Sequence, residues 1–464
     1  MKLKSTMNKY ILIGLAVILI VAVSAAYYQW KSTADFTSAA DTDESEATIA
    51  PTTPAADKSR EDGITRINIY SVDRELDEIV KKYAEEHWEF DYKINYYSDE
   101  AVLGTEDLVE LAKDRLRNGG SEIDLYCVPA AYGRDFINGE YSEYACSYKE
   151  LGIDIDSALK EADIPQYVID DGTNSDGEVV ALPYRADVCV FMYRRSVARE
   201  VWGTDDPDAI ADILGAGTDR WDKFLEAAQI LKEHGYYIVP GFKDISYMID
   251  TSTPASEAVS PKWKEFMDVS KNLLDNGCIK NIGFWTDPWY KDLAGSGDKI
   301  FGLTTMSNLY QYIDFGQAGS DGDWAICMPP YKIVMDYSSG ILVNKNTQNK
   351  DLIGPLIEWI TLDCSESGLQ YRMANGSYKD GEKTSVISGT VLRNADSSLA
   401  TLGGENINPI LYDILKSPDG KHQVYGIESW NFNIWSDATE AYLKGEKDRE
   451  TTIADYIKEA EPAH

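Results

Sequence analysis

Histidine is the scarcest of the residues that commonly carry chemistry, and the 464-residue chain has only four of them. They are His87, His234, His422 and His464. No pair has the spacing of a zinc-binding helix, so the sequence offers few candidates for a zinc site or for histidine-based catalysis.

Cysteine is also sparse, and its spacing excludes the familiar paired motifs. None of the six cysteines forms a CxxC pair, which argues against a zinc ribbon or a thioredoxin-like redox site. The six are Cys127, Cys146, Cys189, Cys278, Cys327 and Cys364. An even number in an exported chain is compatible with disulfides. Buried free thiols fit equally well, because most of these residues lie in apolar runs.

Basic residues are few, since 44 Lys and Arg stand against 78 Asp and Glu for a formal net charge of −34. That balance repels phosphate backbones, so we expect no nucleic-acid partner for the folded part. Nucleotide motifs are missing too: there is no GxxxxGK[ST], and Gly295 and Gly297 lack the third glycine of a dinucleotide site. The sequence also lacks a GxSxG motif, so no nucleophile elbow is present to indicate a serine hydrolase.

The N-terminus has the pattern of an export signal. Lysines in the first nine residues precede an uncharged apolar run over 10–26, and Trp30 lies just beyond it. Extended to Trp30, the run is long enough to remain as a membrane anchor with its lysines inside. Cleavage after Ala25 is the alternative. Residues 1–31 are therefore interpreted as a signal peptide or an N-terminal membrane anchor, and both interpretations stay open.

The composition changes sharply after this segment. Residues 32–62 are rich in Ala, Thr, Ser, Asp and Pro, and such a stretch cannot offset the entropy of ordering itself. We interpret it as a flexible acidic linker. The body that follows lies outside the cell, on the extracellular face of the membrane if anchored, or secreted after signal cleavage. Its length exceeds what one hydrophobic core usually serves, so we expect two lobes.

Strand and helix patterns alternate from the start of this body. The run 64–70 alternates apolar and polar residues like a strand, and apolar residues from Leu76 to Tyr83 then recur at helical spacing. The unit repeats over 92–128. This order predicts an α/β fold with mostly parallel sheets flanked by helices. Ligands of such sheets bind beyond the carboxyl ends of the strands.

Several segments occur in an order that resembles the bacterial extracellular solute-binding protein family 1, the maltose-binding-protein-like carbohydrate-binding subunits of ABC importers. The matching segments run from about residue 64 to 460. They are ITRINIYSVDRELDEIVKKYAEEH, LAKDRLRNGGSEIDLYCVPAAY, DGEVVALPYRADVCVFMYRRSV, WDKFLEAAQILKEHGY, GDKIFGLTTMSN, WAICMPP, SSGILVNKNTQNKDLIGPLIEWIT and YLKGEKDRETTIADYIKEA.

The resemblance implies a two-lobed periplasmic-binding-protein-like fold with discontinuous lobes joined by a hinge. The N-terminal lobe would comprise residues 63–186 plus 331–375, and the C-terminal lobe 187–330 plus 376–464. It also implies a monomeric binding protein, neither enzyme nor cofactor or metal carrier, that captures a sugar or oligosaccharide between the lobes and delivers it to the permease subunits of an ABC transporter. The alternatives are a glycoside hydrolase and a solute-sensing co-receptor that is not coupled to transport.

By the same resemblance, the loop after the first strand reaches the solute through Ser71, Asp73 and Arg74. Asp73 has a structural alternative as a helix cap. The loop after the strand 123–128 is a second contact loop, but the usual Trp and Asp of the family are replaced by Val128 and Ala131, and Tyr132 is expected to substitute.

Arg185 and Asp187 lie where the chain is expected to cross between lobes, with a structural ion pair as the alternative to solute contact. In the second lobe, the family pattern assigns solute contacts to four residues: Asp244, Tyr247, Ser307 and Asn308.

Aromatic side chains complete the expected solute site, because a flat apolar ring suits the C–H face of a sugar. The loop at Ser307 lacks the family's aromatic, and Trp285 would supply it from a neighbouring loop, as would Trp289. Trp430 and Phe432 lie where the family often stacks an aromatic on the sugar. Each has the alternative of being a core residue.

Overall fold

The computed structural model describes residues 63–98, 105–118, 122–248, 261–283, 286–293, 299–307, 322–336, 338–416, 421–424 and 427–460. All of them belong to one compact unit, Ala56–His464. The predicted signal or anchor segment and the linker lie outside the described residues. Within the described part of the chain, no helix is both long and apolar enough to cross a membrane.

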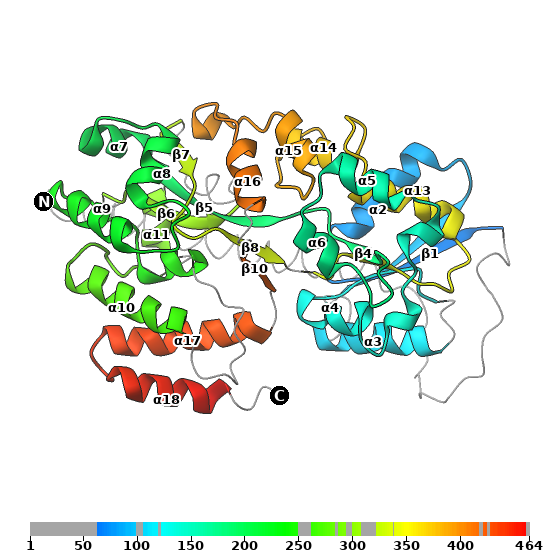
Figure 1. The fold of residues 1–464 in the computed structure, drawn as a ribbon, viewed down its shortest axis with the longest axis horizontal. Helices are drawn as coiled ribbons and strands as arrows, with labels where there is room; N and C mark the ends of the chain where they lie inside the picture. Colours follow the sequence, from blue (N-terminus) through cyan, green and yellow to red (C-terminus); the bar gives the residue numbers. More distant parts are fainter. Residues whose placement is uncertain are drawn as a thin grey trace, which may run out of the picture. The chain divides into compact units, whose positions relative to one another are not determined.

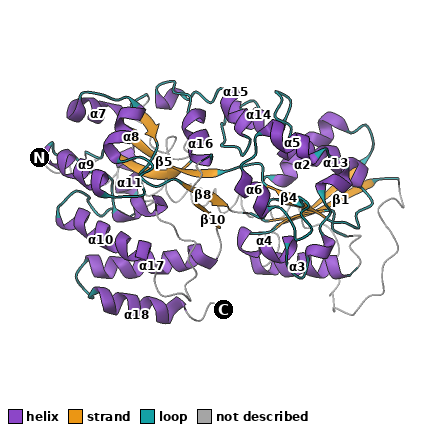
Figure 2. Ribbon diagram, viewed as in Figure 1, coloured by secondary structure: helices purple, strands orange, loops and turns teal. Residues whose placement is uncertain are grey.

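Helices surround two separate five-stranded sheets (Figures 1 and 2). In the first sheet the strand order is β2-β1-β3-β9-β4. β1 is parallel to β2 and β3, whereas β9 is antiparallel to β3 and β4. The strands are β1 (Thr65–Ser71), β2 (Tyr92–Tyr97), β3 (Leu125–Cys127), β4 (Ala181–Leu182) and β9 (Ile341–Val343). The helices from the same stretches of chain are α2 (Leu76–His87), α3 (Thr105–Arg117), α4 (Ala130–Ile137), α5 (Ile155–Ala162), α6 (Gln166–Asp171), α13 (Lys350–Thr361) and α14 (Leu369–Asn375).

β1 and α2 form where the sequence predicts a strand followed by a helix. Ile67 and Ile69 alternate along β1 and are completely buried. Leu76, Ile79 and Val80 form the buried face of α2, and these residues of both elements share one core cluster. Burial of the two apolar faces against the same core fixes the loop between them at the carboxyl end of β1.

A buried carboxylate fastens this sheet to the segment before α13. Asp124 precedes β3 and is 4% exposed. It accepts hydrogen bonds from the backbone N–H of Asn68 at 2.8 Å, from Asn349 Nδ2 at 3.1 Å and from the Thr347 hydroxyl. Burial raises the pKa of Asp124, and these donors act against that rise. The contact ties three segments of the first lobe together.

In the second sheet the strand order is β10-β8-β5-β6, with β7 also paired to β5. The strands are β5 (Asp187–Arg194), β6 (Gly302–Met306), β7 (Trp324–Cys327), β8 (Ile333–Asp336) and β10 (Lys421–Val424). The helices around it are α7 (Arg195–Trp202), α8 (Pro207–Leu214), α9 (Asp222–Glu233), α10 (Pro261–Asp275), α11 (Asp287–Leu293), α17 (Ile427–Leu443) and α18 (Arg449–Ala460). Further short elements are η1 (Ser142–Tyr144), η2 (Tyr148–Leu151), η3 (Phe242–Met248), α15 (Gly389–Asn394), η4 (Ala400–Leu402) and α16 (Asn408–Leu415).

Strand directions in the second sheet differ from the parallel arrangement that the sequence suggests. β5 is antiparallel to β6, β7 and β8, and among the described strands of this sheet β8 and β10 form the parallel pair. β5 enters directly from β4 of the first sheet, and it is buried from Val188 to Tyr193 as expected of a central strand. The direction in which a crossing strand enters a sheet leaves no trace in its residue pattern.

The pairing of β8 identifies where the chain returns to the first sheet. Because β8 pairs with β5 and β10, residues 333–336 belong to the second sheet, and the predicted exchange at residue 331 lies too early. The return occurs between β8 and β9. Gly340 sits at that point with φ +79°, and a Cβ there would lie 2.6 Å from the carbonyl carbon of Leu182. Only glycine fits so close to β4. The other lobe boundaries stay predictions.

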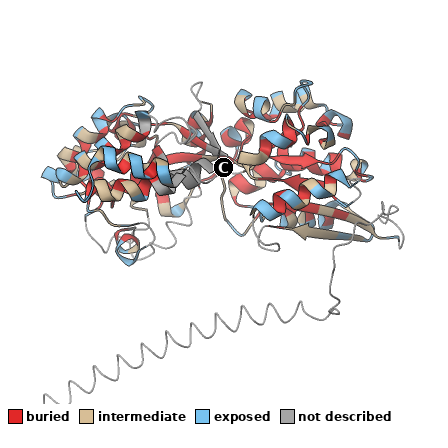
Figure 3. Cartoon of the chain, turned by 90° about the horizontal axis from the view of Figure 1, so that it is seen from below, coloured by how far each residue is buried: buried red, intermediate tan, exposed pale blue. Residues whose placement is uncertain are grey.

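Burial follows the sheets and the inward faces of the helices (Figure 3). One core cluster contains residues of both sheets, such as Leu125 and Val190. A second core belongs to the second sheet and includes Phe191, Phe224 and Trp435. The C-terminal stretch forms two helices, α17 and α18, on either side of Gly445.

Candidate functional site

The loop after β1 is held in place by Ser71 and Asp73. Ser71 is completely buried; its Oγ accepts a hydrogen bond from the Asp73 N–H at 2.9 Å and donates one to the Asp73 carbonyl oxygen at 3.1 Å. Oδ1 of Asp73 accepts from the backbone N–H of Glu75 at 3.1 Å, directly before α2. One carboxylate oxygen thus shapes the start of the helix, which leaves the other for contacts outside the loop.

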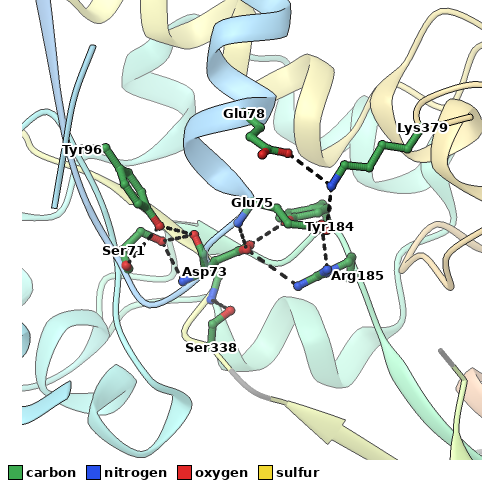
Figure 4. A network of polar contacts seen from close by, with 10 residues as sticks. Ser71, Asp73, Glu75, Glu78, Tyr96, Tyr184, Arg185, Ser338 and Lys379 are labelled. Carbon is green, nitrogen blue, oxygen red and sulfur yellow. Dashed lines mark hydrogen bonds and ion pairs between the residues drawn. The ribbon is translucent and has the colours of Figure 1, made fainter. Parts of the chain in front are cut away.

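That second oxygen connects the loop to the segment after β4. The Tyr184 hydroxyl donates to Oδ2 of Asp73 at 2.6 Å (Figure 4). Burial, and then the charge of Asp73, raises the pKa of Tyr184 well above its ordinary value, so its hydroxyl keeps its proton and remains a donor. The Asp73 side chain is itself only 8% exposed. Its carboxylate is therefore oriented by protein donors at both oxygens.

Arg185 lies beside the same loop but remains accessible. Its Nη1 is 2.9 Å from Glu75 Oε2, and its Nη2 is 3.7 Å from Asp73 Oδ1. The guanidinium also lies over the Tyr184 ring, 5.4 Å from the centroid. The side chain is 36% exposed. A guanidinium carries five N–H donors, so Arg185 is both positioned by carboxylates and able to donate to another molecule.

A lysine from a distant loop completes this group of charges. Lys379 Nζ is 3.3 Å from Glu75 Oε1 and 3.2 Å from Glu78 Oε2 (Figure 4). Burial lowers the pKa of Lys379, but the charges of the two carboxylates outweigh it and raise that pKa. We call the set Ser71, Asp73, Glu75, Glu78, Tyr184, Arg185 and Lys379 the crossover network. It holds three carboxylates and two cations.

Asp187 links the crossover network to the second sheet. It is the first residue of β5 and lies two positions after Arg185. The Ser307 hydroxyl hydrogen-bonds to Asp187, donates to the Ala186 carbonyl at 3.3 Å and accepts from the Val188 N–H at 3.3 Å. Burial raises the pKa of Asp187, while the nearby Arg185 charge opposes that rise.

Asp244 occupies a very different environment. It is completely buried, Oδ2 accepts from the Gly241 N–H at 2.8 Å, and Oδ1 accepts from Trp289 Nε1 at 3.0 Å. Its carbonyl oxygen accepts from the Thr304 hydroxyl. Burial raises the pKa of Asp244 to about 7, and the two side-chain hydrogen bonds oppose the rise. The carboxylate links η3 to α11, and the backbone carbonyl of the same residue links η3 to β6. Trp289, 1% exposed, is a core residue.

The remaining expected contacts are spread over other elements. Arg74 is exposed next to the crossover network, and Tyr132 is partly buried on α4, where burial raises its pKa. Trp430 and Phe432 lie in α17 and Tyr247 in η3; the side chains of these three lie outside what the structure describes, as do residues 285 and 308. The structure thus brings together Ser71, Asp73, Arg185, Asp187 and Ser307.

Sequence reasoning missed the partners that orient these residues. Tyr184 had a local signal, because it directly precedes Arg185 at the expected crossover. Glu75 is separated from Asp73 by one residue and resembles any first-turn helix carboxylate. Lys379 had no signal, since its contact with Glu75 spans some 300 positions of the chain.

Metal chemistry has no support in the described part of the chain. No group of three or more His, Cys, Asp or Glu side chains there is arranged to hold a metal ion. All six cysteines are free thiols, and burial raises the pKa of Cys127, Cys189 and Cys327. The free-thiol alternative therefore holds in this structure.

Solved structures with this architecture are numerous and distant in sequence. A family 1 extracellular solute-binding protein has a TM-score of 0.63 at 12% identity, covering 86% of this chain and 99% of that one. MalE, the sugar-binding protein of Xanthomonas citri, has a TM-score of 0.59 at 14% identity, covering 85% of this chain and 96% of that one. The chain has the two-lobed fold of extracellular solute-binding proteins.

A third solved structure with this fold contains a sugar. The galacto-N-biose-/lacto-N-biose I-binding protein of an ABC transporter from Bifidobacterium longum, in complex with lacto-N-biose, has a TM-score of 0.52 at 14% identity, covering 86% of this chain and 96% of that one. No protein-family model and no curated protein matches the sequence. At such low identity the likeness shows the fold, and function has to be argued from the site.

Proposed function

We propose that this protein is the extracellular solute-binding protein of an ABC importer and that it captures a sugar or oligosaccharide between its lobes. The observation that carries the proposal is the fold shared with sugar-binding proteins over about 85% of the chain. In such folds closure buries the solute between two surfaces that neither lobe supplies alone. Contacts made only in the closed form shift the population toward it, which lets a permease distinguish loaded from empty protein.

The crossover network supports the polar part of this proposal. Asp73 and Asp187 provide acceptors, and Arg185 provides donors that are fixed in direction by Glu75. Paired hydroxyls of a sugar need such alternating donors and acceptors. The first-lobe contacts would be Ser71, Asp73, Arg74 and Tyr132, the crossover contacts Arg185 and Asp187, and the second-lobe contacts Ser307 and Asn308 with Tyr247, Trp285, Trp430 and Phe432. Asp244 would act on them indirectly, because its side chain is completely buried.

The proposal places the folded body outside the cell. Residues 1–31 would export it and then either anchor it or be removed, and residues 32–62 would tether it. The permease subunits would be its partners, and it would act as a monomer. A receptor in place of the permease is the co-receptor alternative; co-purification from membranes identifies which of the two partners is bound.

A thermal-shift screen of mono- and oligosaccharides tests the function. A specific ligand at 100 times its Kd stabilises the folded protein by about 2.7 kcal/mol, which such a screen resolves. Each stabilising sugar is then incubated with the protein and analysed for products. Binding without cleavage supports the proposal. Cleavage would favour a glycoside hydrolase, and the absence of any stabilising saccharide would overturn the sugar assignment.

A further inference from the structure

Three helices of the second lobe, α10, α17 and α18, lie side by side (Figure 1), and one aromatic side chain from each contributes to a shared layer. The ring centroids of Trp263 and Trp435 are 5.5 Å apart, those of Trp263 and Tyr456 5.5 Å, and those of Trp435 and Tyr456 5.1 Å. All three side chains are at most 2% exposed. One residue from each helix therefore closes this end of the three-helix interface.

A second layer of contacts closes the interface further along the same helices. Arg449 Nη1 at the start of α18 is 2.8 Å from Asp268 Oδ1 on α10. Lys271 Nζ on α10 is 5.5 Å from the centroid of the Tyr442 ring on α17. On each helix, these residues are five to eight positions away from the residue that belongs to the aromatic layer. α10 and α17 therefore run side by side in the same direction, and α18 runs back between the two layers.

Three residues with buried hydroxyls lie near these layers: Thr439 and Thr452 between them, and Ser270 level with the second layer, between Asp268 and Lys271 on α10. Thr439 follows Trp435 by four residues on α17, and Thr452 precedes Tyr456 by four residues on α18, so helical spacing places them opposite each other one turn from the aromatic layer. Ser270 follows Trp263 by seven residues, on the same face of α10. Ser270, Thr439 and Thr452 are all 0% exposed.

These buried groups have no hydrogen-bond partner within the described part of the chain. The atoms are Ser270 Oγ, Trp435 Nε1, Ser436 Oγ, Thr439 Oγ1, Thr452 Oγ1 and Tyr456 Oη. A buried hydroxyl without a partner is strongly unfavourable, and protein interiors normally satisfy such groups. A ligand that satisfies them has to be small and neutral and must both donate and accept, because the group contains hydroxyls and an indole N–H and no ionised side chain.

We propose that α10, α17 and α18 enclose a water-binding site, in which bound water joins the hydroxyls of Thr439 and Thr452, between the aromatic layer and the Asp268–Arg449 layer, to the hydroxyl of Ser270, level with the second layer. Water is the one common ligand with two donors and two acceptors that fits between side chains of this size. The site holds the hairpin of α17 and α18 in register on α10, as a polar layer does in other helix interfaces. It does so on the helix that also carries Trp430 and Phe432.

Two measurements on the full chain test this proposal without any solute. The first is a crystal structure at a resolution that shows ordered water: we expect water within hydrogen-bond distance of at least two of the three hydroxyls. The second is the melting temperature of the double variant Thr439→Val, Thr452→Val. If water bridges the two threonines, replacing both hydroxyls with methyl groups removes its partners and lowers Tm by several degrees.

Thr361→Val is the matched control, because Thr361 is a completely buried helical threonine whose hydroxyl donates to the Ile357 carbonyl at 2.7 Å. Its change in Tm measures the loss of one direct hydrogen bond. A dry interface predicts the opposite sign for the double variant, since removal of two unsatisfied hydroxyls would raise Tm. Such a rise, or an interface without ordered water, would overturn the proposal. If the double variant does not fold, the crystal structure of the unaltered protein decides.

Discussion

Two carboxylates that the sequence places in the same role, Asp73 and Asp244, lie in opposite environments. Asp73 is at the carboxyl end of β1, next to a guanidinium that is 36% exposed. Asp244 is completely buried, and its side-chain oxygens accept from Gly241 and Trp289. The first is oriented by protein donors and still adjoins accessible donors. The second has its hydrogen-bonding capacity used inside the second lobe.

Residue type and position in a loop therefore do not distinguish a residue that contacts solute from one that has a structural role. Asp73 follows β1 and Asp244 lies in η3, and the family resemblance assigns both to segments that contact the solute. Both carboxylates accept protein hydrogen bonds, and what separates them is their access to solvent. Asp244 is completely buried, whereas Asp73 adjoins the Arg185 side chain, which is 36% exposed.

The largest expected effect is on stability, for Asp244→Ala. The change removes the acceptors of the Gly241 N–H and the Trp289 indole N–H and leaves both donors buried. At about 1–3 kcal/mol for each unsatisfied group, we expect a loss of about 3 kcal/mol or more in the free energy of unfolding. Denaturant unfolding followed by tryptophan fluorescence measures it. Asp73→Ala is the matched control and should lose clearly less; equal losses would erase the distinction drawn here.

Asp244 also predicts a specific dependence of stability on pH. Its pKa is about 7 in the folded protein and 3.8 as an isolated group, so between these values the folded state holds one more proton. The contribution of Asp244 to the stability of the folded protein is complete below pH 4 and is lost as the pH rises to about 7. The slope is at most about 1.4 kcal/mol per pH unit. Asp292, with a pKa raised to about 6 by burial, acts in the same direction.

Asp244→Asn removes this proton while keeping the shape of the side chain. The variant should therefore show a shallower decline of stability between pH 4 and 7 than the unaltered protein. Unfolding experiments at a series of pH values make the comparison, and Asp73→Asn serves as the control that keeps Asp244. An unchanged slope in Asp244→Asn would show that the carboxylate is already ionised in the folded state.

At the crossover network the expected effect is on affinity. Asp73→Asn replaces an acceptor with a group whose amide end repels the Tyr184 and Arg185 donors. Loss of a charge-assisted hydrogen bond of about 2 kcal/mol weakens solute binding about 30-fold. Fluorescence titration with the saccharide found by screening measures the change. Affinity equal to that of the unaltered protein would remove Asp73 from the site.

Arg185→Met should weaken binding less, by about tenfold, because the apolar stem that covers Tyr184 is retained while the donors are lost. It also leaves Glu75 paired with Lys379. The same titration applies, and Arg185→Lys is the control: it keeps the charge but not the forked geometry. Recovery of full affinity in Arg185→Lys would mean that charge alone matters at this position.

The smallest effect is expected for Lys379→Met. Lys379 is 40% exposed, and ion pairs of exposed lysines contribute about 1 kcal/mol or less. The variant should unfold within about 1 kcal/mol of the unaltered protein, and its affinity should stay within about fivefold. A loss as large as that of Arg185→Met would place Lys379 among the direct solute contacts.

Much of the fold follows from local pattern. The alternation in β1, the apolar face of α2 and the break at Gly445 between α17 and α18 are all visible in the sequence, because each depends on neighbours within a few residues. The antiparallel direction of β5 was not visible, since it depends on where β4 leaves the first sheet.

The site divides in the same way. Ser71, Asp73, Arg185, Asp187 and Ser307 were assigned through the family resemblance, from their positions after strands or at the crossover, and their contact with solute stays a prediction. The Tyr184 and Lys379 contacts join segments more than 100 residues apart and have no local signature. The burial of Asp244 depends on Trp289 and Thr304, and both of these residues are distant from Asp244 in the sequence.

Isothermal titration calorimetry can test whether Asp73 contacts the solute while Asp244 has a structural role. Three proteins are titrated with the same saccharide: the unaltered chain, Asp73→Asn and Asp244→Asn. We expect micromolar binding by the unaltered chain, equivalent to about −8 kcal/mol, about 30-fold weaker binding by Asp73→Asn, and affinity within about threefold of normal for Asp244→Asn. Equal weakening in both variants, or no heat with any saccharide, would contradict this account.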